Sequence, residues 1–254
     1  MLDVVLDTSY WIELKEDPDA LQAFRQTKEA HELRVYFTRP NFTDLAKAEE
    51  QDRLSRILAD TVDLYMVIED FNSDEYYHSE NPLLIGEPGD REYLARHTED
   101  FGEEKTLKFM FRIYDQEPDQ DYPVIAEKLR DLYREHGEGY LETATFWRYV
   151  ETTDTGGSRL DFSNVTALSY VRRKLKSEHA KQLQPNENVR FQDRIDIELC
   201  TYAIAVADVF VVEEKWVNQG IIPAVLNDLE GDDPPVLVTS LGELFETVPD
   251  LSTT

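Results

Sequence analysis

The stretch Val209-Phe210-Val211-Val212-Glu213-Glu214 decides how the rest of the chain is interpreted. Four consecutive apolar residues, three of them β-branched, predict a strand that is buried on both faces. The strand stops at two acids, and residues 196–207 before it carry the apolar pattern of a helix. A helix that leads into a fully buried strand is typical of an α/β domain with a parallel sheet.

The same alternation of strands and helices occurs at the start and the end of the chain. Short apolar runs predict further strands at 3–6, 34–38, 64–68 and 236–238. Helical patterns predict helices at 11–24, 43–58 and 241–245, with Pro40 opening a turn before the second of these. We therefore expect an α/β fold, a parallel sheet flanked by helices, built from residues 1–70 and 190–254.

The segment between these two parts, residues 71–189, has a different pattern. Apolar residues recur at helical spacing in 122–133 and 165–175, and no stretch of the segment predicts a strand. We expect it to form an inserted helical subdomain.

The charge of the chain is strongly acidic. Among 254 residues, 53 Asp and Glu face 26 Lys and Arg, which gives a formal net charge of -27. Such a chain either binds a basic partner or has a halophilic surface adapted to molar salt, and the even scatter of the acids favours the second interpretation. At molar salt the Debye length is only ~3 Å, so this net charge does not exclude a nucleic-acid substrate.

Other features of the composition indicate the compartment. The single Cys200 cannot form an internal disulfide, and no apolar run approaches the ~18 residues of a membrane span. The first residues lack the basic and apolar regions of a signal peptide. We expect a soluble cytoplasmic protein that does not associate with membranes.

Acids occupy the positions where an open parallel sheet places its functional groups. Asp7 follows the first strand, Glu213 or Glu214 follows the strand at 209–212, and Asp196 and Asp44 are expected to begin helices. Carboxylates that converge on one edge repel one another unless a cation neutralises them. Oxygen ligands of this kind suit Mg²⁺ or Mn²⁺, which can activate water and stabilise charge on a phosphoryl group.

Three of these acids also have a purely structural interpretation. Asp7, Asp44 and Asp196 could all be helix N-caps, which stabilise a helix by ~1 kcal/mol. Asp193 competes with Asp196 for its position, and Glu49 is an alternative to Asp44. The signal for a site lies in the strand-end positions taken together.

Three segments resemble PIN-domain nucleases. The start, Val4-Val5-Leu6-Asp7-Thr8-Ser9, is similar to the first PIN strand, which ends on an Asp followed by small hydroxyl residues. Residues 193–216 resemble the part in which an Asp opens a helix and a hydrophobic strand delivers another acid shortly before an aromatic residue. The final strand and helix, 236–245, also resemble their PIN counterparts.

This resemblance implies a function. In the family the acids hold one or two divalent ions and hydrolyse RNA phosphodiesters, and many members are toxins of the VapC type. A toxin-like member would have an antitoxin-like protein partner. The resemblance assigns the metal and catalytic roles here to Asp7, Asp44, Asp196 and Glu213, with Glu214 as the alternative, and it assigns Thr8 or Ser9 to orienting the metal or water.

The chain departs from the family pattern at three positions. Asp44 stands where Glu is usual, Glu213 stands where Asp is usual, and Val212 replaces a Thr or Ser. These departures support an alternative function, a non-catalytic PIN-like module that binds another protein. A phosphatase-like α/β enzyme is disfavoured because no Asp-x-Asp follows the first strand.

One stretch of the chain, residues 172–194, is mainly basic. It is either a surface that grips phosphates beside the site or a solvated helix face. The nucleic-acid-binding candidates are Arg172, Arg173, Lys174, Arg190 and Arg194. A homodimer is a further prediction, with Trp11, Phe146 and Trp147 as candidate contacts.

Overall fold

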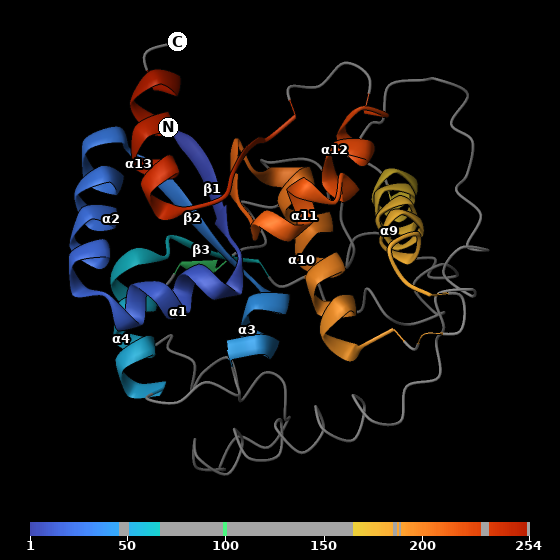
Figure 1. Cartoon of the computed structure of the whole chain (residues 1–254). Coiled ribbons are helices and arrows are strands. Elements are labelled where there is room, and N and C mark those ends of the chain that lie inside the picture. Colours follow the sequence, from blue (N-terminus) through green and yellow to red (C-terminus); the bar gives the residue numbers. More distant parts are fainter. Residues whose placement is uncertain are drawn as a thin grey trace.

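The computed structural model describes residues 1–45, 51–66, 99–100, 165–184, 187, 189–229 and 234–252. These residues form a three-layer α/β fold, in which helices cover both faces of a central sheet (Figure 1). The predictions for residues 67–98 and 101–164, which include the helix at 122–133, lie outside the described residues.

The described strands form one six-stranded sheet in the order β4-β3-β2-β1-β5-β6. Its strands are β1 (Leu2–Leu6), β2 (Leu33–Thr38), β3 (Leu64–Met66), β4 (Glu99–Asp100), β5 (Val209–Val211) and β6 (Val236–Val238). All neighbouring pairs are parallel except β3 with β4. The predicted α/β fold with a parallel sheet flanked by helices is therefore confirmed.

Alternating residues of the central strands supply two separate cores. Val4 and Leu6 of β1 face one cluster of buried side chains, whereas Val5 faces the other. The same alternation holds in β5, where Val209 packs on the first side and Phe210 on the second. Both faces of these strands are buried, which explains their unbroken apolar sequence.

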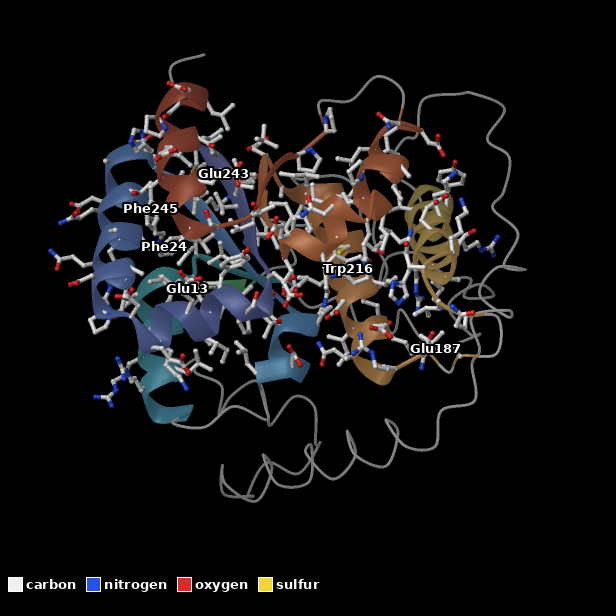
Figure 2. All side chains as sticks on the ribbon, viewed as in Figure 1. Glu13, Phe24, Glu187, Trp216, Glu243 and Phe245 are labelled. Atoms are coloured by element: carbon white, nitrogen blue, oxygen red, sulfur yellow. The ribbon has the colours of Figure 1, made fainter. Side chains whose placement is uncertain are left out.

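Four helices cover the first face of the sheet. They are α1 (Thr8–Glu16), α2 (Pro18–His31), α4 (Gln51–Thr61) and α13 (Leu241–Leu251). Asp17 separates α1 from α2 and caps α2 by accepting hydrogen bonds from the backbone amides of Asp19 and Ala20. Phe24 is fully buried in the apolar cluster of this face, and Phe245 packs against that cluster from α13 (Figure 2).

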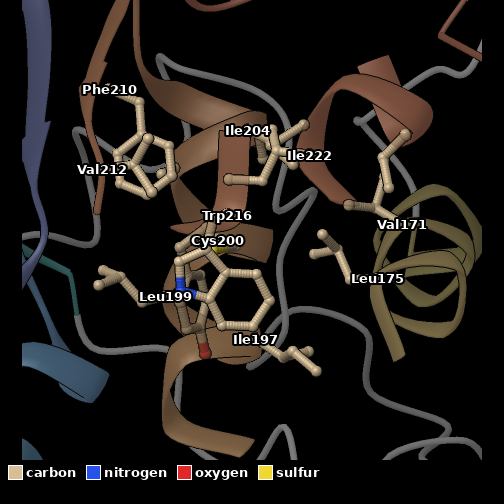
Figure 3. Close-up of a cluster of buried hydrophobic side chains, with 14 of the residues drawn as sticks. Val171, Leu175, Ile197, Leu199, Cys200, Ile204, Phe210, Val212, Trp216 and Ile222 are labelled. Carbon is tan, nitrogen blue, oxygen red and sulfur yellow. The ribbon is translucent and has the colours of Figure 1, made fainter. Parts of the chain in front are cut away.

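The second face is covered by α9 (Val165–Ala180), α10 (Phe191–Val206), α11 (Glu214–Asn218) and α12 (Ile221–Leu226). Trp216, which is buried, lies in the cluster that joins these helices to the sheet (Figure 3). Val171 and Leu175 of α9 belong to the same cluster. The described end of the predicted insertion thus packs on α10 and α12.

Three sequence predictions about individual elements were wrong. The helix α3 (Arg39–Leu45) begins before Pro40, where a turn was expected. Proline is tolerated there because the first helical amides have no partner within the helix. The helix α10 begins at Phe191, five residues before Asp196. The strand β4 lies in a segment that was expected to be wholly helical, and two acidic residues carry no apolar signal by which it could be recognised.

An ion pair closes the edge of the sheet at the amino ends of the strands. Arg34 donates two hydrogen bonds to the Asp3 carboxylate, at 2.7 and 2.8 Å, and Asp3 is only 2% exposed. The backbone amide of Asp3 donates to the Asp208 carboxylate at 2.8 Å. These contacts join β1, β2 and the residue before β5 at the edge opposite the candidate site.

Two further predictions concern a membrane span and a dimer interface. None of the described helices is long and apolar enough to cross a bilayer. Trp11 is fully buried and contacts Phe24 of α2 and Phe37 of β2 edge to face, so the prediction that it is a dimer contact was wrong. Its burial follows from its place on the inner face of α1. Phe146 and Trp147 lie outside the described residues.

Candidate functional site

The carboxyl ends of β1 and β5 lie side by side and bring two predicted acids to one edge. The two strands are parallel neighbours, with Leu6 opposite Val211. The backbone amide of Asp7 continues this ladder by donating to the Val211 carbonyl at 2.8 Å. Asp7 and Glu213, far apart in sequence, therefore meet at the same edge of the sheet.

Asp7 is the most deeply buried acid of this edge. It stands at the N-cap position of α1, but its side chain makes no capping hydrogen bond, so the capping interpretation fails. The residue is 5% exposed, and burial together with the charges of Asp196 and Glu213 raises its pKa to about 7. A hydrogen bond from the Glu213 backbone amide and the charge of Lys215 only partly offset these effects.

Asp196 lies inside α10 rather than at its start, which corrects the prediction that it opens the helix. The first turn instead contains Asp193, whose carboxylate accepts a hydrogen bond from the Arg190 backbone amide at 3.1 Å. Asp196 lies one turn further along and is 7% exposed. The structure thus separates a helix-starting acid, Asp193, from an acid that faces the site.

The surroundings of Asp196 pull its pKa in both directions. Burial is the largest influence and raises the pKa, and the charges of Asp44 and Glu213 add to it. Lys215 and the hydrogen bond from Gln192 lower it, and the resulting pKa is about 6. The positive charge and the hydrogen bond around this carboxyl therefore do not fully offset its burial.

Asp44 reaches the cluster from α3, the sixth residue of a seven-residue helix. The prediction that it begins a helix was wrong, since α3 already starts at Arg39, and with it the capping interpretation fails. The helix α3 packs against α10, and the charge of Asp44 raises the pKa of Asp196. Glu49, its alternative, lies outside the described residues.

The two consecutive acids after β5 have different surroundings. Glu213 precedes α11, makes no capping hydrogen bond, and its charge raises the pKa values of both Asp7 and Asp196. Glu214 is exposed in the first turn of α11 and accepts a hydrogen bond from Asn218 at 2.7 Å. The structure therefore brings Glu213, and not Glu214, together with the other acids.

A lysine that sequence reasoning did not single out bridges two of the acids. The Lys215 ammonium lies 2.7 Å from Oε2 of Glu213 and 3.3 Å from Oδ2 of Asp196. Oδ1 of Asp196 accepts a hydrogen bond from Gln192 at 2.8 Å. In the sequence Lys215 has the pattern of an ordinary surface residue of a helix, so no signal marked it.

Asn41, also missed by the sequence analysis, fixes the backbone around Asp7. Its buried amide donates to the Leu6 carbonyl at 2.9 Å and to the Thr8 hydroxyl at 3.3 Å. Its oxygen accepts from the backbone amide and the hydroxyl of Thr38, at 3.1 and 2.7 Å. One side chain thus holds the ends of β1 and β2 and both neighbours of Asp7.

A tyrosine of α1 holds the other strand end. The Tyr10 hydroxyl lies 3.2 Å from the Val212 carbonyl and 2.6 Å from the Thr239 carbonyl. These contacts position the residue immediately before Glu213. Of the two hydroxyls predicted to serve the site, Thr8 is engaged by Asn41, whereas Ser9 Oγ is buried without a hydrogen-bond partner among the described residues.

The basic stretch is largely paired with acids. Arg172 contacts Glu198 at 3.1 Å, Lys174 contacts Asp228 at 2.7 Å, and the exposed Arg190 contacts Asp193 at 2.7 Å. Arg173 and Arg194 are partly buried. Ion pairs thus engage Arg172, Lys174 and Arg190 within the protein, and the Arg190 side chain remains 72% exposed.

The chemistry of the acidic edge suits a hard cation, but the side chains are not arranged as a closed metal site. The donors are carboxylate oxygens from β1, α3, α10 and the end of β5, and two of these carboxyls have raised pKa values. Within the part of the chain that the structure describes, no group of three or more His, Cys, Asp or Glu side chains could hold a metal ion. Lys215 stands between two of the donors.

Comparison with known proteins adds no assignment. No protein-family model matches the chain, and neither the curated proteins nor the solved structures give a significant match. The function must therefore be inferred from the acidic edge itself.

Proposed function

We propose that the acidic edge binds a divalent cation, Mg²⁺ or Mn²⁺, and that the protein is a metal-dependent endonuclease acting on RNA. The observation that carries this proposal is the burial of Asp7 and Asp196 beside further acids, which leaves both pKa values well above 3.8. A structural role gives no reason for this arrangement, because neither residue caps a helix. Perturbed acids at strand ends of an α/β sheet are typical of functional sites.

Four side chains would hold the cation: Asp7, Asp44, Asp196 and Glu213. The cation would supply an activated water and stabilise the charge that develops on the phosphodiester. With a pKa of about 7, Asp7 is about half protonated at neutral pH, whereas Asp196, with a pKa of about 6, is protonated mainly below that pH. Both carboxyls must be ionised when a cation binds. Binding should therefore strengthen as the pH rises through 6 to 7.

The surrounding residues would keep the acids in place while the substrate binds. Asn41 holds the backbone on both sides of Asp7, and Tyr10 holds the residue before Glu213. Rigid strand ends preorganise a site more accurately than loops do. RNA as the substrate follows from the resemblance to PIN domains, as does an antitoxin-like partner.

The test is cleavage of labelled single-stranded RNA in ~2 M KCl with Mn²⁺. Two neighbouring substitutions provide a matched comparison, since Glu213→Gln removes an acid coupled to the cluster and Glu214→Gln removes an exposed one. We expect Glu213→Gln and Asp7→Asn to lower the Mn²⁺-dependent rate by at least about 100-fold, because even residues that only support metal ligands contribute 10–100-fold. Glu214→Gln should cleave like the wild type. Equal rates in all four proteins would exclude this site.

A second function is favoured by one observation, the position of Lys215. An ammonium that is already paired with Glu213 and Asp196 would suit a protein that has kept the fold and uses another surface to bind a protein partner. Calorimetry with Mn²⁺ separates the two, because a folded wild type that binds no Mn²⁺ would support the binding module.

A further inference from the structure

Lys215 is the cation that the described structure places directly on the acidic edge. It lies in the first turn of α11 and bridges Oε2 of Glu213 and Oδ2 of Asp196. Its side chain is 42% exposed, whereas the Asp196 side chain is almost completely buried. The ammonium therefore approaches the buried acids from the solvent side.

The ammonium is held by more than the two carboxylates. Its nitrogen lies 5.6 Å from the ring centre of Trp216, a distance that permits a cation–π interaction. Trp216 is buried in the apolar cluster of this face (Figure 3). Its ring also packs against His179, with ring centres 5.3 Å apart, so the ring is held in place. The Lys215 ammonium thus has a defined position beside the acids.

A divalent cation and this ammonium would compete for these carboxylates. Two of the proposed donors, Glu213 and Asp196, are the contacts of Lys215, and two cations a few Å apart repel strongly in a partly buried site. The exposed lysine stem can swing into solvent, whereas Asp196 is fixed within α10. The lysine is therefore the group that must move when a metal ion enters.

We propose that Lys215 is an internal counter-cation that occupies the place of the divalent ion and thereby sets the affinity of the acidic edge for metal. This inference rests on the proposed metal-dependent function. It explains why the described acids are not arranged as a closed metal site, because Lys215 contacts two of the four. Release of the ammonium would free both carboxylates together.

The test compares Mn²⁺ affinity in the wild type, Lys215→Met and Lys181→Met, measured by calorimetry in ~2 M KCl. Methionine keeps an unbranched stem and removes the charge. Lys181 is the matched control, since it pairs with Glu178 at 2.7 Å rather than with the acidic edge. High salt screens the uniform effect of removing one positive charge from the protein.

We expect Lys215→Met to bind Mn²⁺ about three- to fivefold more tightly than the wild type, as loss of a competing ion pair predicts. Lys181→Met should bind like the wild type. Equal or weaker binding by Lys215→Met, while the wild type binds, would overturn the role of Lys215 and leave the proposed function standing. No binding by any of the folded proteins would overturn both. Lys215→Gln, which keeps a polar group above Trp216, provides the same comparison if the methionine variant does not fold.

Discussion

Replacing the buried acid by its amide, Asp7→Asn, should stabilise the metal-free protein. Asparagine has nearly the same shape, and its oxygen can still accept the hydrogen bond that the Glu213 backbone amide gives to Asp7. The substitution removes a charge that burial and the neighbouring acids disfavour. A functional site is expected to carry such a stability cost.

The size of the effect follows from the two pKa values of Asp7. In the unfolded chain the carboxyl titrates near 3.8, whereas in the folded protein its pKa is about 7. The folded state therefore binds the proton more tightly, and stability falls as the pH rises between these values. At 1.36 kcal/mol per pKa unit, the loss is complete above pH 7 and amounts to about 4 kcal/mol.

The assay is urea unfolding of both proteins in ~2 M KCl with EDTA, at pH 5 and pH 8. We expect Asp7→Asn to exceed the wild type by about 4 kcal/mol at pH 8 and by less than about 2 kcal/mol at pH 5. An exposed acid, Asp60, supplies the control, and Asp60→Asn should gain nothing at either pH. A variant that is no more stable than the wild type at pH 8 would refute the conclusion that the ionised Asp7 carboxylate destabilises the folded protein.

Three other perturbations should give defined results. Asn41→Ala removes the hydrogen bonds to the Leu6 carbonyl and the Thr8 hydroxyl and should lower the free energy of unfolding by about 2 kcal/mol in urea, whereas an unchanged value would contradict this role. Arg34→Met leaves the Asp3 carboxylate buried without its ion pair and should cost about 3–5 kcal/mol in the same assay, whereas a loss below 1 kcal/mol would contradict this. The melting temperature, followed by circular dichroism, should rise between 0.2 and 2 M KCl, because salt screens the repulsion within a chain of net charge -27. A melting temperature that falls over this range would argue against a salt-adapted surface.

The sheet could be predicted from the sequence because its strands are buried on both faces. The runs at 3–6, 34–38, 209–212 and 236–238 differ from β1, β2, β5 and β6 by no more than one residue at either end. Strands that are buried on both faces have nearly continuous apolar sequences, which made these short runs recognisable. In contrast, β4 depends on pairing with β3 and has no pattern of its own.

Helix starts were harder to predict, for a physical reason. Aspartate is common at helix N-termini, so Asp196 and Asp44 each had a simple local explanation. In the structure the Asp193 carboxylate accepts a hydrogen bond from the Arg190 backbone amide at the start of α10, so Asp196 lies within that helix. The helix α3 begins at Arg39, so Asp44 also lies within a helix. An acid inside a helix gains nothing from capping, so its position must be explained by what the helix packs against.

The residues that support the acids could not be predicted, because their roles depend on contacts between distant segments. Asn41 donates a hydrogen bond to the carbonyl of Leu6, 35 residues away. The Tyr10 hydroxyl contacts the carbonyls of Val212 and Thr239, each more than 200 residues away along the chain. Lys215 is close in sequence to Glu213, yet its bridge to Asp196 requires α10 and α11 to be packed together. Sequence patterns report burial and local capping, whereas these contacts are set by the tertiary fold.

The choice between a nuclease and a binding module depends on which cation neutralises the acidic edge. Asp7 and Asp196 keep raised pKa values, chiefly because burial disfavours their charged forms, and the charge of Lys215 only partly offsets this effect and the repulsion from the neighbouring acids. An acidic edge kept only for structure would be expected to lose its buried charges, since the neutral amide at Asp7 should be more stable by several kcal/mol. The unbalanced charge therefore favours a divalent ion as the partner of this edge, with Lys215 as its competitor.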